Sequence, residues 1–239
     1  MQGKNAPKEI STTPQKPPRT IAIDGPGASG KSAVGGLLAR RLGYRFLDTG
    51  VMYRALTWFI LEQGASPQDE ETVGRAAKSV RMDVSTAPPD GDEPSSVSVN
   101  GRDATQFLAR PDVEANVSLV SRLPAVREAM VAIQRREAGR AAGIVVAGRD
   151  IGTVVLPDAD LKVYLDASPE ERARRRQEQA ERRGDATTQE GVSEELARRD
   201  TIDSTREASP LRPAADAVIL DTDGLSLEQV VERILAMTQ

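Results

Sequence analysis

The sequence predicts an α/β fold in which helices cover both faces of a parallel sheet. Short apolar segments typical of strands recur along the chain, and segments with the apolar spacing of helices lie between most of them. This alternation is typical of parallel strands joined by helical crossovers. A glycine-rich segment that directly follows the first expected strand is the second observation. We therefore expect one α/β domain over residues 20–239.

Five segments are expected to form the parallel sheet. They are residues 20–24, 44–48, 143–148, 161–167 and 216–221. One region departs from the alternation: VRMDVST and SVSVNGRDA flank the turn-rich segment APPDGDEPS at residues 87–95. This pattern indicates a small antiparallel β insert, at about residues 80–115, with the turn-rich segment at its hairpin tip.

Composition limits the classes of protein that fit. Residues 1–19 are rich in Pro, Lys and Thr, so we expect a disordered tail outside the domain. The chain has no Cys and no His, which excludes thiol nucleophiles, histidine bases and disulfides. Its net charge of -4 gives no general attraction to nucleic acid, and no apolar run is long enough to span a membrane. We expect a cytoplasmic monomer with neither nucleic-acid nor membrane partners.

Residues 25–32, GPGASGKS, fit the phosphate-loop pattern G-x-x-x-x-G-K-[ST] between a strand and a helix start. Backbone N–H groups of such a loop surround phosphate oxygens. Lys31 is expected to reach the β- and γ-phosphates, and Ser32 to ligate Mg²⁺. The residues expected to bind ATP here are Gly25, Pro26, Gly27, Ala28, Ser29, Gly30, Lys31, Ser32 and Ala33.

The same glycines also satisfy G-x-G-x-x-G, the pattern of a dinucleotide-binding fold. Asp48 ends the next strand about 20 residues further on, as that fold requires. Glycine spacing alone does not separate the two interpretations. Lys31 favours the phosphate loop, because beyond the tail the chain contains only two other lysines, Lys78 and Lys162.

Arginines and carboxylates follow the expected strands, where ligands bind in open α/β sheets. They are Asp48, Thr49 and Arg54 after the second strand, Arg149 and Asp150 after the third, and Arg199, Asp203 and Arg206 on one face of a later helical segment. Each group alone fits a surface ion pair or helix charge pairing. Together they indicate a phosphate site, because guanidinium groups bind phosphate bidentately. The Asn-Lys-x-Asp motif of GTPases is absent from the sequence.

Four segments together resemble the bacterial-type cytidylate kinases, which phosphorylate CMP and dCMP. They are GPGASGKS, FLDTGVMYR, AGRDIGTVVLPDADLKVYLDASPEERARRR and RRDTIDSTREASPLRPAADAVILDT. The resemblance runs from about Thr20 to the C-terminus. It implies a P-loop nucleoside monophosphate kinase domain similar to adenylate kinase, with five parallel strands, an insert for the acceptor and a mobile helical lid. It also implies transfer of the γ-phosphoryl group of ATP to CMP and dCMP, with Mg²⁺.

The resemblance assigns roles by position. It places Arg54, Arg149, Arg199 and Arg206 around the CMP phosphate, with Asp203 and Arg199 near the ribose and the Thr49 hydroxyl in the acceptor site. Ser118, Arg127 and Asp150 are implied to read cytosine, whose N4 amine can donate to a carboxylate. The expected catalytic residues are Lys31, Arg149, Arg199 and Arg206. An acceptor other than CMP, such as UMP or shikimate, remains an alternative.

The expected lid, about residues 168–186, opens with the helix-start residues Ser168 and Pro169 and continues with a run of arginines. Arg172 and Arg176 lie one turn apart and are expected to close over ATP and neutralise its charge. A solvated helix with internal Glu–Arg pairs is one alternative, and a nucleic-acid surface is another. The second is weaker, because aromatic residues, which stack on bases, make up 3% of the chain.

Overall fold

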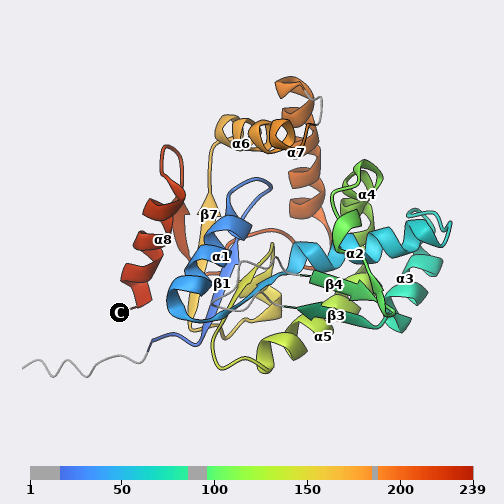
Figure 1. The fold of residues 1–239 in the computed structure, drawn as a ribbon, viewed down its shortest axis with the longest axis horizontal. Coiled ribbons are helices and arrows are strands. Elements are labelled where there is room, and N and C mark those ends of the chain that lie inside the picture. Colours follow the sequence, from blue (N-terminus) through green and yellow to red (C-terminus); the bar gives the residue numbers. More distant parts are fainter. Residues whose placement is uncertain (1–16, 86–95, 185–187, 239) are drawn as a thin grey trace, which may run out of the picture.

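The computed structural model of the protein describes residues 17–85, 96–184 and 188–238 (Figure 1). In that part of the chain five parallel strands form one sheet in the order β2-β6-β1-β7-β8, and three antiparallel strands form a second in the order β3-β4-β5. The predicted parallel sheet and antiparallel insert are therefore confirmed. Most of the predicted tail, and the whole hairpin tip at residues 87–95, lie outside the described residues.

The elements alternate along the chain as expected. The strands are β1 Thr20–Asp24, β2 Arg45–Asp48, β3 Met82–Ser85, β4 Ser96–Val99, β5 Arg102–Asp103, β6 Ile144–Ala147, β7 Leu161–Asp166 and β8 Val218–Asp221. The helices are α1 Lys31–Leu42, α2 Thr49–Glu62, α3 Glu70–Ser79, α4 Pro111–Ser121, α5 Pro124–Gly139, α6 Pro169–Arg183, α7 Gln189–Thr205 and α8 Leu227–Leu235. Three short helical turns complete the fold, η1 Thr105–Phe107, η2 Ile151–Val155 and η3 Ala236–Thr238.

The parallel sheet is apolar on both faces because each face is covered by helices. In β1, Ile21 and Ile23 pack with α1 and α8 on one face, whereas Ala22 joins the core formed with α2, α4 and α5 on the other. Figure 1 shows this layering, with α1 and α8 on the left and the insert and its helices on the right. The carboxyl ends of β1, β2 and β6 lie at one edge of the sheet, because the strands are parallel and in register.

Local sequence sets the helix ends that position the site. The Ser168 side chain accepts from the N–H of Glu171, so α6 begins as predicted. Residues 111–139 form two helices, because Pro124 starts α5 after a break at Leu123. Arg206 lies in extended backbone just after α7, at the helix end and not within the helix.

Among the described residues, no helix combines the length and the apolar character needed to cross a membrane.

Candidate active site

A cavity of about 570 Å³ opens where the phosphate loop, the start of α2 and the segment after β6 face α6 and α7. This volume is within the usual range of small-molecule sites. In Figure 1 the loop between β1 and α1, drawn in blue, points toward α6 and α7. The groups that were expected to converge from separate strands therefore face one space.

The phosphate loop presents its backbone to this cavity. Gly30 precedes α1 with φ 92°, a conformation that favours glycine, and supplies no side-chain acceptor for the first turn of the helix. That turn also contains no acidic residue. Lys31 Nζ donates to the carbonyl of Pro26 at 2.6 Å and contacts Ser29 Oγ at 3.3 Å, so the side chain folds back over the loop. The helix N-terminus is thus open to an anion.

Ser32 and Asp48 form the oxygen-rich wall beside the loop. Ser32 Oγ donates to Asp48 Oδ2 at 2.5 Å, and Asp48 Oδ1 accepts from the N–H of Gly50 at the start of α2. Hydroxyl and carboxylate oxygens are the ligands that Mg²⁺ prefers. Within the described residues, no cluster of three or more His, Cys, Asp or Glu side chains could hold a metal ion. A bound Mg²⁺ would therefore need further ligands from a nucleotide and from water.

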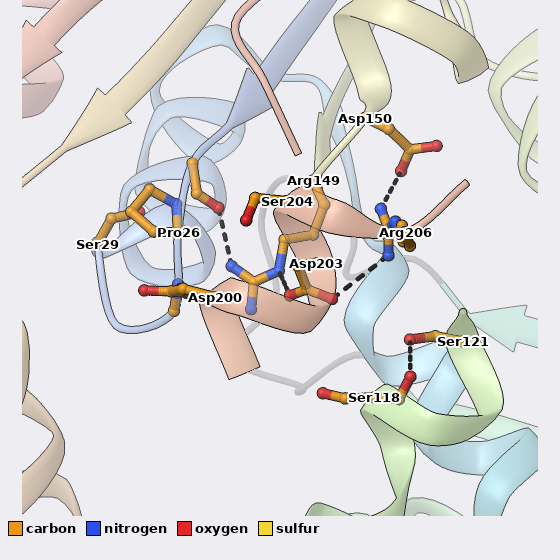
Figure 2. Close-up of polar contacts among 12 residues, drawn as sticks. Pro26, Ser29, Ser118, Ser121, Arg149, Asp150, Asp200, Asp203, Ser204 and Arg206 are labelled. Atoms are coloured by element: carbon orange, nitrogen blue, oxygen red, sulfur yellow. Dashed lines mark hydrogen bonds and ion pairs between the residues drawn. The ribbon is translucent and has the colours of Figure 1, made fainter. Parts of the chain in front are cut away.

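Arg149, Asp203 and Arg206 form a chain of contacts across the site (Figure 2). Arg149 Nη1 donates to the carbonyl of Gly25 at 2.9 Å, and its Nε lies 2.7 Å from Asp203 Oδ2. Arg206 Nη1 reaches the other oxygen of Asp203 at 3.4 Å. The structure therefore brings the residue after β6 and those of α7 together at the phosphate loop, as the strand-end argument predicted.

Positive charge is in excess around the loop. Burial lowers the pKa of Lys31 well below its ordinary value, and the charge of Arg149 lowers it further. Burial also lowers the pKa of Arg199 to about 10, with Arg149 again the next cause. The Nε of Arg199 is buried and has no hydrogen-bond partner within the described residues. A bound anion would stabilise the protonated forms of both side chains, as expected at a site for phosphate groups.

A second wall of the cavity is polar and more deeply buried. Arg127 Nη2 donates to Asp150 Oδ2, and both side chains are 4% exposed. The Arg127 guanidinium lies 5.1 Å from the ring centre of Tyr53, a contact of the cation–π type. Burial raises the pKa of Tyr53 to about 12, so its phenol is neutral at physiological pH.

Comparison with known proteins assigns the chain to a family. The family model for cytidylate kinase matches residues 21–239. The chain belongs to the cytidylate kinase family. It is 50% identical to the cytidylate kinase of Mycobacterium avium (strain 104) over 214 residues, 90% of this chain and 92% of that protein. It is 48% identical to that of Roseiflexus castenholzii (strain DSM 13941 / HLO8), over 92% of this chain and 93% of that protein. It is 46% identical to that of Geobacillus sp. (strain WCH70), over 90% and 94%.

Membership of the cytidylate kinase family makes the chain an ATP-dependent kinase and decides against the dinucleotide-binding alternative. Most residues expected to bind ligands line the cavity: Gly27, Ala28, Gly30, Lys31, Ser32, Ala33, Thr49, Arg54, Arg127, Arg149, Asp150, Arg176, Arg199, Asp203 and Arg206. Gly25, Pro26 and Ser29 lie in the loop behind that surface. Ser118 is buried on α4 and does not line the cavity, whereas Ser121, one turn later, does.

The lid arginines differ from the expectation for a cytidylate kinase lid. Arg176 lines the cavity and pairs with Glu114 of α4, on the opposite side. Arg172 does not line it. Its guanidinium is buried against Asp200 and the carbonyls of Gly27 and Ala167. The two arginines lie one turn apart on α6, as expected, but α7 and the phosphate loop cover Arg172.

Sequence reasoning missed three side chains that shape this cytidylate kinase site. Tyr53 and Arg175 line the cavity, and Arg175 is held by Thr222 through two hydrogen bonds, at 3.0 Å to its Oγ1 and 2.7 Å to its carbonyl. Asp24 is buried at the end of β1 and accepts from the N–H groups of Ile151 and Gly152, both at 2.7 Å. Tyr53 lies in the segment FLDTGVMYR that carried the resemblance, and its aromatic ring was the signal available.

Proposed function

We propose that the cavity binds ATP along the phosphate loop and CMP or dCMP beside Asp150, and that the γ-phosphoryl group of ATP passes to the acceptor phosphate to give CDP or dCDP and ADP. One observation carries this proposal: Lys31, Arg149 and Arg199 line one cavity, and the buried Nε of Arg199 has no hydrogen-bond partner within the described residues. The triphosphate of ATP and the phosphate of CMP meeting at this point would supply acceptors and negative charge.

On the donor side, the open N-terminus of α1 and the Lys31 ammonium would hold the β- and γ-phosphates. Arg176 lines the same space and is offered as the lid residue that follows the migrating charge. Its pair with Glu114 would have to open for this contact. Arg172 is withdrawn from that role because its guanidinium is already held beneath the loop.

Mg²⁺ fits the Ser32 hydroxyl, whose proton is held by Asp48 so that its lone pairs are free to face a cation. The ion would supply positive charge that neutralises the phosphate groups of ATP during transfer. Asp48 would act on the metal through Ser32 or through a bound water.

On the acceptor side, Arg54, Arg149, Arg199 and Arg206 surround the space proposed for the CMP phosphate. Asp203 would accept from a ribose hydroxyl, since it is already fixed by Arg149 and Arg206. The buried Arg127–Asp150 pair would read cytosine, with the Asp150 carboxylate accepting from the N4 amine. Ser118 remains part of this proposal only if α4 shifts when the acceptor binds, because its side chain is buried away from the cavity.

The chemistry requires alignment more than proton abstraction. The attacking atom is a phosphate oxygen that is largely ionised at neutral pH, so no strong base is needed. This suits a chain without His or Cys. Lys31 and the arginines would hold the two phosphates in line and stabilise the transferring group, and closure of α6 and α7 would keep water from the γ-phosphate.

Every residue in this proposed mechanism comes from one chain, which supports a monomer as the active unit. We place its action in the cytoplasm. Gel filtration of the active enzyme tests the first of these statements.

The test is an ADP-release assay with Mg-ATP and, in turn, CMP, dCMP, UMP, AMP, GMP, shikimate or no acceptor. We expect strong stimulation by CMP and dCMP and little by the others. Lys31→Ala should reduce turnover with every acceptor by at least 10²-fold, since an electrostatic contact to the transferring group is lost. Lys78→Ala on exposed α3 is the matched control and should keep wild-type rates.

Two outcomes would contradict the proposal. Equal stimulation by UMP and CMP would remove the cytosine-reading role of Asp150. Near-normal turnover by Lys31→Ala would show that the phosphate loop is not the donor site.

A further inference from the structure

The phosphate loop is held from outside by one side chain of α6 and one of α7. Asp200 of α7 and Arg172 of α6 pair with each other, and together they grip the backbone around Gly27. Asp200 Oδ1 accepts from the N–H of Gly27 at 3.2 Å, and Arg172 Nη1 donates to the carbonyl of the same residue at 3.2 Å. Both backbone polar groups of one loop residue are thus satisfied by one ion pair.

Apolar contacts close the same junction. Leu196, one turn before Asp200, lies 3.0 Å from the position that a β-carbon on Gly27 would occupy. Ala28 packs against Ala173, Val192 and Leu196 of the two helices. The helices therefore pack directly on the tip of the loop, and a β-carbon at residue 27 would require Leu196 to shift by a few tenths of an ångström.

The contacts of Asp200 and Arg172 with Gly27 lie next to a strained backbone position, Ala28. Ala28 has φ 59°, in the left-handed region that costs a residue with a side chain about 1 kcal/mol or more. Such a conformation persists when neighbouring contacts fix it. The contacts of Asp200 and Arg172 at the preceding residue, together with the packing of Ala28, supply that constraint.

Helix α7 faces two sites at once. Figure 2 shows Asp200 beside the loop that carries Pro26 and Ser29, and Asp203 one turn later, paired with Arg149. Arg199, the neighbour of Asp200, lines the cavity. A shift of α7 would therefore move the phosphate loop and the acceptor-side residues together.

We propose that Asp200 is a positioning residue for the phosphate loop. Because Asp200 lies on α7, which also carries the acceptor-side residues Arg199 and Asp203, the position of α7 then affects how the loop binds its nucleotide. The proposal rests on the assignment of the loop to ATP in the proposed function. Asp200 touches neither reactant in it. Asp200 acts by fixing the Gly27 backbone, with Arg172 as its partner.

The experiment measures binding of ADP by calorimetry, alone and with saturating CMP, which form a complex that cannot react. For Asp200→Ala we expect about tenfold weaker ADP binding, the effect of losing a hydrogen bond to a charged group. CMP binding to the nucleotide-free enzyme should change less than twofold. The factor by which CMP changes ADP affinity, whatever its size in the wild type, should move toward one in the variant.

Asp200→Asn separates positioning from general support of the fold. It keeps an oxygen for the Gly27 N–H but loses the charge that pairs with Arg172, so its loss of ADP affinity should be smaller than that of Asp200→Ala. Glu195→Gln, exposed on the same helix, is the matched control and should bind ADP as the wild type does. If circular dichroism shows that Asp200→Ala does not fold, the ADP affinity of Asp200→Asn becomes the test. We expect it to be measurably weaker than that of the wild type.

The Lys31→Ala variant distinguishes failure of the proposed function from failure of the role proposed for Asp200. Wild-type ADP affinity in both Lys31→Ala and Asp200→Ala would mean that the loop is not the nucleotide site, so the proposed function fails. A loss in Lys31→Ala with wild-type affinity and coupling in folded Asp200 variants would overturn the role of Asp200 alone. A lowered melting temperature in the Asp200 variants with unchanged ADP affinity would also overturn it, because that result describes a structural role only.

Discussion

Removal of the Asp150 carboxylate tests how the acceptor wall is held together. Its side chain is 4% exposed, and it faces Arg127, also 4% exposed, and Arg206, 3% exposed, with Arg206 Nη2 at 3.9 Å. Asp150→Ala would leave Arg127 without its counter-charge, and its remaining side-chain hydrogen bond within the described residues would be the 3.5 Å contact to the carbonyl of Ser121. Loss of one partner from a buried pair costs about 3–5 kcal/mol.

This cost is a large part of the ~5–15 kcal/mol that stabilises an ordinary domain. With a urea m-value of about 2 kcal/mol per M, the unfolding midpoint should fall by roughly 2 M. Urea titration followed by circular dichroism measures it, and Asp158→Ala at an exposed position on the same connection is the control. A midpoint shift below about 0.5 M would mean that the pair is not desolvated, and the reasoning would fail.

The same residue predicts a split in kinetics. Asp150→Asn keeps the shape of the side chain, and it should raise the KM for CMP at least tenfold, because a charge-assisted hydrogen bond to the base is lost. The KM for ATP should stay within about twofold, since ATP is proposed to bind along the phosphate loop and not at Asp150. Equal increases in both constants would contradict the base-reading role.

Three further predictions concern stability. Burial raises the pKa of Asp24 from 3.8 to about 6, so between these pH values the folded protein holds a proton that the unfolded chain releases. The free energy of unfolding should therefore fall by about 3 kcal/mol as pH rises from about 4 to 6. Urea midpoints measured against pH should show this fall, and Asp24→Asn should remove it. Gly35→Ala would place a β-carbon 2.5 Å from Phe46 Cε2, and it should lower the free energy of unfolding by about 1–3 kcal/mol, measured by thermal unfolding. Gly36→Ala is the control: its β-carbon would lie 3.8 Å from the nearest side-chain atom, so it should not destabilise the protein. Trp58→Ala, at a fully buried position, should lose about 3–5 kcal/mol in urea unfolding, and Trp58→Phe clearly less.

The sheet could be predicted because buried parallel strands are apolar on both faces and stand out from the helices. Each of the five expected strands matches an observed strand to within two residues at either end. Helix boundaries were less accurate. Pro124 marks the start of α5 and could have revealed the break after α4, but apolar spacing continues across it.

The convergence of the phosphate loop with Arg149 and Asp150 could be predicted from the sequence, because the ends of parallel strands meet at one edge of the sheet. The partners of the lid arginines could not be predicted. Spacing places Arg172 and Arg176 on one face of α6, but it does not say that α7 covers the first and leaves the second at the cavity. Asp24 and Asp200 were missed for a related reason: their partners are backbone N–H groups of distant segments, at Ile151, Gly152 and Gly27, which leave no local pattern.

The order of strands in the sheet also bears on how the chain is made. β1 is the central strand and leaves the ribosome first, yet Ile21 lies opposite Val145 of β6 and Leu161 of β7. β2 pairs with β6 as well. At about 5–20 residues per second, β1 waits roughly 6–25 s and β2 roughly 5–20 s before their shared neighbour β6 begins to be made. Through that interval the two apolar strands have unpaired edges, so we expect the nascent chain to be most prone to misassociation before residue 144 is translated.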